Sequence, residues 1–315
     1  MFSRKMLFSV GGALVLCALL VFAKGKPPDK PGGGGGGGGD GGLTGTIYLT
    51  VYQPNTNPPG EPGNGGRDLQ QMDADGSNKT SLGLALNVVG EPSHSLHGGQ
   101  RWFLRRSQSA IFAFSEDGLT DVKLTGDTVY ELTGDVRWSP DDAQVSFVDA
   151  AGIYVADIVY SDGAVAGLDG SPTLLIDASG IVSHHWAPDG TEIVYAGGGQ
   201  ITIYDLATDT TSDLTTGAHP VWSPEGSLIA FARGAEGIYT IGPDGSDETR
   251  ILRSQAGKYI WYLSPEWSPT GGHLICLASR DESLDNDVYR IAYDGSGKTN
   301  LTKDVDTDAI PIAWR

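Results

Sequence analysis

The chain has 315 residues, of which 39% are hydrophobic and 19% charged, a balance typical of one large folded domain or two ordinary ones. The formal net charge is −18 and no segment concentrates Lys and Arg, which argues against binding to the phosphate backbone of nucleic acids. The same acidic balance favours basic proteins, peptides or Ca²⁺ as partners.

The N-terminal segment has the pattern of an export signal. Arg4 and Lys5 precede an apolar run from Met6 to Phe22, and residues 21–23 resemble a small-residue cleavage site. We therefore expect residues 1–23 to be a signal peptide that directs the protein to the bacterial periplasm or the extracellular space. The alternative is a retained leader that anchors the chain in the membrane, since the apolar run lies between a signal core and a spanning helix in length.

Residues 24–45 form a segment rich in glycine and proline, reading KGKPPDKPGGGGGGGGDGGLTG. Such a composition cannot bury enough apolar surface to offset the chain entropy, so we expect a flexible linker. Because Cys17 lies in the signal, Cys276 is the single cysteine of the mature chain, and no internal disulfide can form. Its apolar, strand-like surroundings predict a buried thiol.

Beyond the linker, one motif recurs. Its strong copies are WSPDDAQVSF (138–147), WAPDGTEIVY (186–195), WSPEGSLIAF (222–231) and WSPTGGHLIC (267–276). A degenerate copy, HSLHGGQRWF, begins at His94, and Trp314 starts another. A second element, an apolar strand followed by an acidic glycine turn, recurs in phase with the first. Each unit therefore predicts four strands with a period of two and no helix.

Four-stranded units of this length predict an all-β fold, a six-bladed β-propeller formed by residues 46–315. The first unit begins at Thr46 without a tryptophan strand, whereas the last unit stops after one. We therefore expect a composite blade of N- and C-terminal strands that closes the ring. Two segments that break the rhythm, Gln53–Gly66 and Ser161–Pro172, are expected to be loops.

The motif W-S-P-D-G…I-A-F…I-Y-x-x-x-x-D-G-S…L-T, present throughout residues 46–315, resembles the WD40-like (PD40) repeat of TolB-type six-bladed propellers. The resemblance implies an exported bacterial propeller that binds a protein or ligand at a face or channel. The α/β domain that precedes the TolB propeller is replaced here by the signal and linker. Prolyl peptidases with similar repeats use a G-x-S-x-G nucleophile elbow, which does not occur in this sequence.

The position before each tryptophan anchor varies in charge, as a channel-facing position would. It holds Arg137, His185 and Glu266 in three copies, and we expect these residues to face a ligand. His184 and His185 are neighbours, so strand alternation points them to opposite sides, and His184 is expected to be structural. The repeated tryptophan, proline, acid and glycine are expected to build the turn and the packing between blades.

Metal sites are weaker alternatives. His94, His97, His185 and His219 would have to converge from several blades to bind a metal, which the sequence does not establish. The acids of Asp304–Asp308 suit Ca²⁺ but lack the glycine and distant glutamate of a calcium loop. The stretch GSGKT (295–299) imitates a phosphate loop but coincides with the ordinary turn of the repeat.

The sequence therefore predicts a binding protein without a catalytic set and without a cofactor, whose partner is a protein or peptide, a small molecule or a glycan. The second hypothesis is a channel-site enzyme of the propeller lyase or lactonase type, acting on a sugar with a divalent metal. A membrane-anchored sensor is the third, and it requires a retained leader.

Overall fold

The computed structural model describes residues 43–53, 66–83, 93–107, 109–255, 260–280, 283–303 and 309–315. The chain divides into two units, Met1–Gly39 and Asp40–Arg315, and every described residue belongs to the second. The predicted signal peptide (1–23) and nearly all of the predicted linker (24–45) lie outside the described residues, as do Asp304–Asp308. In the described ranges, no helix has the length and apolar character needed to span a membrane.

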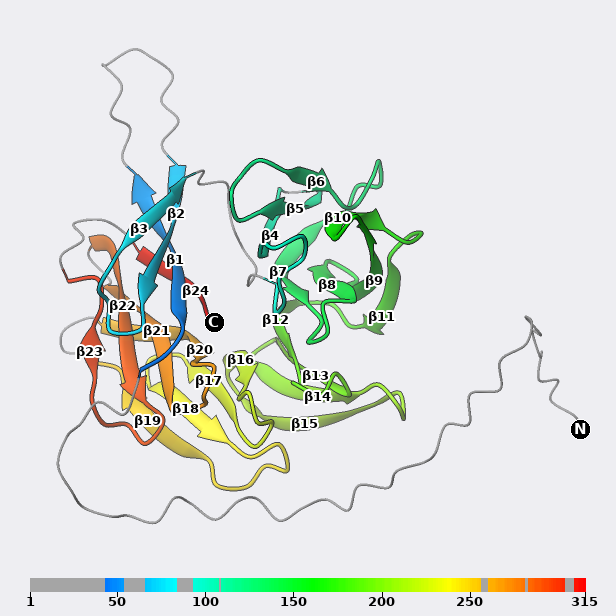
Figure 1. The fold of residues 1–315 in the computed structure, drawn as a ribbon. Coiled ribbons are helices and arrows are strands. Elements are labelled where there is room, and N and C mark those ends of the chain that lie inside the picture. The colour runs from blue at the N-terminus through cyan, green and yellow to red at the C-terminus, as the bar shows by residue number, and fades with distance from the viewer. Residues whose placement is uncertain are drawn as a thin grey trace, which may run out of the picture. The chain divides into compact units, whose positions relative to one another are not determined.

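The unit Asp40–Arg315 is an all-β six-bladed propeller, as predicted, with six antiparallel sheets placed around a central axis (Figure 1). Each sheet is a blade, and its strands run outward from the axis in sequence order, apart from the closing strand of the first blade.

The strands of the first three blades are as follows. Blade 1 contains β24 (Ala309–Trp314), β1 (Thr46–Gln53), β2 (Gly66–Asp73) and β3 (Thr80–Gly83). Blade 2 contains β4 (Trp102–Arg106), β5 (Ile111–Ser115) and β6 (Asp121–Lys123). Blade 3 contains β7 (Leu132–Trp138), β8 (Gln144–Asp149), β9 (Gly152–Ser161), β10 (Ala164–Leu168) and β11 (Thr173–Asp177).

The other three blades have four strands each. Blade 4 contains β12 (Ile181–Trp186), β13 (Glu192–Gly197), β14 (Gln200–Asp205) and β15 (Thr210–Thr216). Blade 5 contains β16 (Ala218–Trp222), β17 (Ile229–Arg233), β18 (Gly237–Ile241) and β19 (Thr249–Arg253). Blade 6 contains β20 (Ile260–Trp267), β21 (His273–Arg280), β22 (Ser283–Ala292) and β23 (Thr299–Asn300).

The composite closing blade is confirmed. Strand β24 pairs with β1 in antiparallel register, with Ile47 opposite Trp314, and the backbone amide of Arg315 donates to the carbonyl of Thr46 at 2.8 Å. Phe103 of blade 2 packs in one buried cluster with Tyr48 and Ala313 of blade 1, which joins the two blades across the closure. The last strand of the ring therefore completes the first blade.

The tryptophans pack between blades, as predicted. Each contacts a buried cluster of the preceding blade: Trp138 with Trp102 and Leu104, Trp186 with Val148 and Ile153, Trp222 with Ile201 and Ile203, Trp267 with Val221 and Ala230, and Trp314 with Ile275 and Val288. A tryptophan that ends an inner strand thus supplies a large apolar plate to its neighbour. Cys276 belongs to one of these clusters and is 1% exposed, so its predicted burial is confirmed.

The serine and glycine of the motif build the turn. The hydroxyls of Ser139, Ser223 and Ser268 each accept a hydrogen bond from the backbone amide five residues later, at 2.9–3.0 Å. The glycine position has positive φ, for example 73° at Gly190, a conformation that glycine adopts without steric cost. These are structural roles, as the repetition predicted.

One loop prediction is wrong. Within Ser161–Pro172, strand β10 pairs with the second half of β9, while β11 pairs with the first half, so the insertion extends the sheet. The turn at residues 162–163, where Asp162 and Gly163 both have positive φ, reverses the chain directly into a hairpin. The other predicted loop, Gln53–Gly66, joins β1 to β2, and its residues 54–65 lie outside the described part.

Candidate functional site

The inner strands of the blades end around one pocket of about 310 Å³ on the axis of the propeller. All six blades contribute to it. The residues that line it are His94, Arg137, Trp138, Pro140, His185, Trp186, Pro188, Trp222, Ser223, Pro224, Glu266, Trp267, Ser268, Pro269 and Arg315. The lining therefore combines five ionisable side chains with prolines, tryptophans and serines of the repeated motif.

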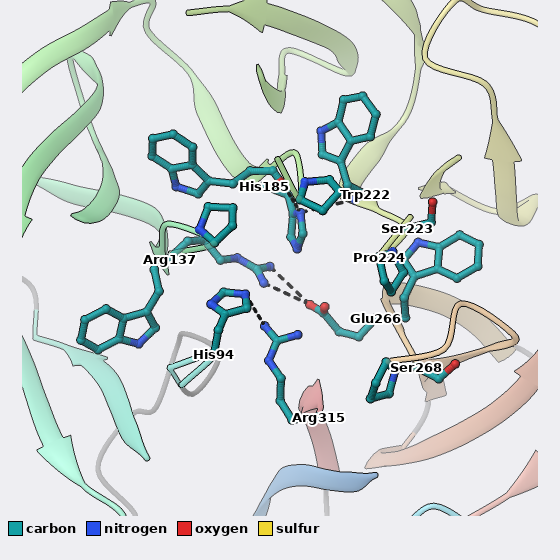
Figure 2. Close-up of a pocket in the computed structure, with 15 residues that line it drawn as sticks. His94, Arg137, His185, Trp222, Ser223, Pro224, Glu266, Ser268 and Arg315 are labelled. Atoms are coloured by element: carbon teal, nitrogen blue, oxygen red, sulfur yellow. Dashed lines mark hydrogen bonds and ion pairs between the residues drawn. The ribbon is translucent and has the colours of Figure 1, made fainter. Parts of the chain in front are cut away.

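The three residues that the sequence predicted to face a ligand lie together. Arg137 of β7, His185 of β12 and Glu266 of β20 all line the pocket, and Figure 2 shows their side chains directed toward one another. They come from three blades, and each directly precedes its tryptophan anchor. The varying charge at this position thus identified residues that share a pocket.

Arg137 and Glu266 form a buried ion pair. Both terminal nitrogens of Arg137 contact the same carboxylate oxygen, Oε1 of Glu266, at 3.3 and 3.4 Å, and Asp135 Oδ2 lies 3.5 Å from Arg137 Nη2. Burial raises the pKa of Glu266 to about 7, although Arg137 acts in the opposite direction. Burial also lowers the pKa of Arg137, but the two carboxylates outweigh it and hold that pKa above its ordinary value.

His184 and His185 are separated by strand alternation, as predicted. His184 is fully buried, and its Nε2 lies 2.6 Å from the hydroxyl of Ser146, which also accepts a hydrogen bond from the Trp186 indole. His184 is therefore structural, as expected. His185 turns its Nδ1 to the carbonyl of Trp186 at 2.8 Å. Burial, followed by the charge of Arg137, lowers the pKa of His185 to about 3, so the ring is neutral.

The four histidines of the metal hypothesis do not form one cluster. His94 and His185 line the pocket, whereas His97 stacks on Tyr160 with ring centroids 4.3 Å apart. His219 precedes the anchor by three residues, and burial lowers its pKa. Across the ranges that the structure describes, no group of three or more His, Cys, Asp or Glu side chains is arranged to hold a metal ion.

Asp142 is a buried residue that the sequence reading missed. It occupies the glycine position of its motif copy, with φ of 57°, and its carboxylate is 0% exposed. It accepts hydrogen bonds from the backbone amides of His94 and Ser95 at 2.8 and 2.6 Å, and it contacts His94 Nδ1 and His97 Nε2 at 3.1 and 3.2 Å. Blade 3 therefore fixes the degenerate turn of blade 2.

The hairpin of β9 and β10 supports the same turn. Tyr160 of β9 stacks on His97 and donates its hydroxyl to the carbonyl of Asp142 at 2.7 Å. A Cβ added to Gly98 would lie 3.1 Å from the carbonyl oxygen of Gly163, so the two glycines allow close backbone approach. The two irregular segments of the repeat, the degenerate copy and the insertion, thus pack on each other.

Arg315 is a pocket residue that the sequence reading also missed. It follows Trp314 in the place that serine takes in the W-S-P turns, and its guanidinium lies 3.4 Å from Nε2 of His94 (Figure 2). Burial lowers the pKa of Arg315 to about 10, so it stays protonated at neutral pH. The sequence did contain a signal for these residues, because each one departs from the repeat. Arg315 replaces the serine, His94 the tryptophan and Asp142 the glycine of the motif.

The structure defines a six-bladed β-propeller with a charged pocket on its axis. No protein-family model matches the sequence, and no curated protein sequence matches it. Among solved structures, a chain designated TolB from Agrobacterium tumefaciens has 20% identity over 87% of this chain and 99% of that chain, with a TM-score of 0.61. TolB from Acinetobacter baumannii has 19% identity over 85% of this chain and 66% of that chain, with a TM-score of 0.62.

The propeller fold is also similar to a chain of a nidogen/laminin complex, with 10% identity over 86% of this chain and 97% of that chain and a TM-score of 0.56. Identities this low show a common fold. The chain is thus a six-bladed β-propeller that is structurally similar to the C-terminal propeller domains of TolB proteins.

Proposed function

We propose that the protein is a TolB-type binding propeller without catalytic activity, which takes a segment of a protein partner in its axial pocket. The supporting observation is the origin of the pocket: all six blades place side chains there, and four prolines of the motif are among its lining residues. A concave site with apolar walls and a few converging polar groups is typical of recognition. At about 310 Å³, the pocket has room for a side chain or a chain end.

The charges around the pocket favour a basic partner surface. Asp141, Asp189 and Glu225 directly follow three of the prolines that line the pocket, and all three are exposed. Together with the net charge of −18, these acids attract a basic surface to this end of the propeller. Association should therefore slow as ionic strength rises, because salt screens exposed charges.

Export is the second part of the proposal. Residues 1–23 act as a cleaved signal, and residues 24–45 tether the propeller. Mass spectrometry of the mature protein isolated from its host tests this, with an N-terminus at Lys24 as the expected result. A mature protein that keeps residues 1–23 would contradict cleavage and favour the anchored form.

Binding at the pocket is tested by blocking it. His185→Trp fills the pocket from β12, whereas Val182→Trp, on the same strand, alters a side chain that is 48% exposed and is not among the pocket-lining residues. The full chain and both variants are cross-linked to proteins of an envelope extract, and the captured proteins are compared by mass spectrometry. We expect a partner that Val182→Trp retains and His185→Trp loses.

Pro224→Trp is a second blocking variant at an exposed pocket residue, and it keeps the test valid if His185→Trp fails to fold. Capture that is identical in the wild type and in a folded blocking variant would overturn the proposal. The enzyme hypothesis is tested by metal analysis of the purified chain. A tightly held, stoichiometric divalent metal that is lost on His185→Ala would favour the enzyme.

A further inference from the structure

The axial pocket holds more basic than acidic side chains. Arg137, Arg315, His94 and His185 line it, and Glu266 is the acidic residue among its lining residues. They come from β7, from the end of β24, from the degenerate turn of blade 2, from β12 and from β20. Because His185 is neutral, the charged side chains that line the pocket are two arginines and one carboxylate, with Asp135 also beside Arg137. Two arginines in a concave site of a protein with a net charge of −18 indicate an anionic group in the ligand.

The ion pair in the pocket is loosely formed. Arg137 contacts a single oxygen of Glu266 at 3.3–3.4 Å, although both side chains are only 12% exposed. On blade 5, Arg233 contacts both oxygens of Glu248 at 2.7 and 2.8 Å, the geometry of a strong bidentate pair. A buried pair with long contacts recovers little of the cost of removing its charges from water. A better-placed carboxylate can therefore replace Glu266 as the partner of Arg137.

We propose that the axial pocket binds a carboxylate group of the partner segment, between Arg137 and Arg315, and that Glu266 leaves its ion pair and takes up one proton as this carboxylate binds. This proposal rests on the proposed function and names the chemistry that the pocket recognises. The carboxylate belongs to an acidic side chain or to the chain end of the partner, and the proton comes from solvent.

His94 positions Arg315 for this contact. The carboxylate of Asp142 lies 3.1 Å from Nδ1 of His94, and this contact directs Nε2 toward Arg315, where it accepts from a guanidinium N–H at 3.4 Å. His185 is neutral, and its Nδ1 lies 2.8 Å from the Trp186 carbonyl oxygen and 3.4 Å from the Trp222 backbone nitrogen, so contacts to two blades hold the ring beside the two arginines.

Proton uptake follows from the charges around Glu266. Burial places the pKa of Glu266 near 7 while it still contacts Arg137. Asp135 already lies 3.5 Å from Arg137, so a ligand carboxylate that takes the place of Glu266 there removes that stabilisation and adds a like charge, which raises the pKa of Glu266 further. Binding is therefore tighter in mildly acidic solution, where Glu266 is already protonated, and weaker above its pKa. Between pH 6 and pH 8 the dissociation constant should rise by about tenfold.

Other titratable groups lie near Glu266. Arg137 and Asp135 of β7 act directly on it, whereas His185 of β12, His94 of the blade 2 turn and Arg315 share its pocket. His219 of β16 interacts with Asp135 and Arg137. Burial holds the pKa of His185 at about 3, and the two arginines stay charged, so these three groups do not titrate between pH 6 and pH 8. Burial also lowers the pKa of His219. The variant His94→Gln tests whether the imidazole of His94, rather than Glu266, produces the pH dependence.

Succinate is the probe for the carboxylate site, titrated into the full chain at constant ionic strength against sodium chloride. Four tryptophans line the pocket, so intrinsic fluorescence reports binding. We expect succinate to bind about tenfold more weakly at pH 8 than at pH 6. Glu266→Gln should bind at both pH values as the wild type does at pH 6. His94→Gln should keep the tenfold pH dependence.

Arg315→Gln should weaken succinate binding by about tenfold or more, since it removes one of two cations. Arg233→Gln is the matched control, because it removes an arginine of the outer part of blade 5 and should leave binding unchanged. Any one of three results would overturn the proposal. The folded wild type could give no succinate-dependent signal, Arg315→Gln could bind succinate as tightly as the wild type, or the wild type could bind equally at pH 6 and pH 8.

A competition arm identifies the source of the carboxylate. Saturating succinate should release the partner that the cross-linking experiment captures, if the partner supplies the carboxylate. A partner that needs the open pocket but remains bound in succinate overturns the carboxylate proposal and leaves the proposed function standing. Capture that does not depend on the pocket overturns the proposed function instead, while the succinate titration still decides whether a carboxylate binds.

Discussion

Asp142 offers a sharp test of how the pocket is built, because the other strong copies of the motif have glycine at its position. The change Asp142→Gly suits the positive φ of 57° but removes a carboxylate that contacts two backbone amides and two imidazoles. Glycine alone would be expected to stabilise this backbone conformation by about 1 kcal/mol. We expect the loss of contacts to outweigh that gain.

The magnitude follows from the contacts. Burial acts to raise the pKa of Asp142, but the hydrogen bonds from the His94 side chain and from the amides of His94 and Ser95 outweigh it and lower the pKa from 3.8 to about 2. A difference of this size corresponds to about 2 kcal/mol of stability at neutral pH. Leaving buried amides without an acceptor adds about 1–3 kcal/mol, so Asp142→Gly should cost about 3 kcal/mol in total.

Urea unfolding at pH 7 measures this loss, and the melting temperature should fall by about 6–12 °C for a domain of this size. Asp142→Asn, which removes the charge alone, should cost about 2 kcal/mol. Because the folded pKa is depressed, the stability that the carboxylate contributes is present above about pH 4 and disappears as the pH falls toward 2. The difference between the wild type and Asp142→Asn should shrink over that range.

Gly190→Asp is the matched control. It places aspartate at the same turn position of blade 4, where φ is 73° and an added Cβ meets no atom within 4 Å. It should cost about 1 kcal/mol, from backbone strain alone. The reasoning is refuted if Asp142→Gly is as stable as the wild type, or if Gly190→Asp costs as much as Asp142→Gly.

Three further predictions concern the framework of the propeller. Ser146→Ala removes the hydroxyl that contacts both His184 and the Trp186 indole, and the two buried groups left without it should lower the free energy of unfolding in urea by about 2–4 kcal/mol. A loss below about 0.5 kcal/mol would show that these two hydrogen bonds are dispensable. Gly237→Ala should lower the free energy of unfolding by about 3 kcal/mol or more, because φ is 126° and the new Cβ would lie 1.9 Å from the Leu252 carbonyl oxygen. Gly190→Ala should lower it by about 1 kcal/mol, and equal losses would contradict the steric argument. Cys276 is 1% exposed and burial raises its pKa to about 12, so a thiol reagent should modify it about a hundredfold more slowly in the native protein than in urea, and equal rates would disprove its burial.

The ring of blades was predictable from the sequence because the repeated residues themselves form the turn and the packing between blades. Trp186, Pro188 and Gly190 have local reasons to recur, and recurrence at a regular spacing predicts a propeller. The composite blade was predictable because the first unit lacks a tryptophan strand, which the C-terminal strand supplies. The loop prediction for Ser161–Pro172 failed because a local signal was missed: Asp162-Gly163, between two apolar runs, is the sequence of a two-residue hairpin turn, and it pairs β10 with β9.

The candidate site was predicted in part. Comparing copies singled out Arg137, His185 and Glu266, since an inner-strand position before the tryptophan repeats its geometry in each blade. Arg315 and Asp142 were missed although each replaces a motif residue, because a repeat alignment shows the replacement and not the contact between blades that gives it a role. The inner strands also contain register shifts, with positive φ at His219 and Ser264, beside the prolines at 220 and 265. Prolines in an inner strand were an available sign of these bulges.

Closure of the composite blade also determines when in folding the axial pocket becomes complete. Trp314 donates its indole N–H to the carbonyl of Thr44 at 3.0 Å, across 270 positions of the chain. Contacts so distant in sequence form late, when the C-terminal part of the propeller has been synthesised. Until then, β1 leaves the backbone N–H and C=O groups that pair with β24 unpaired, and such an open edge invites pairing with other chains. Since Arg315 follows β24 directly, the pairing of β24 with β1 also brings Arg315 to the pocket, so the proposed binding pocket is complete only in a molecule whose ring has closed.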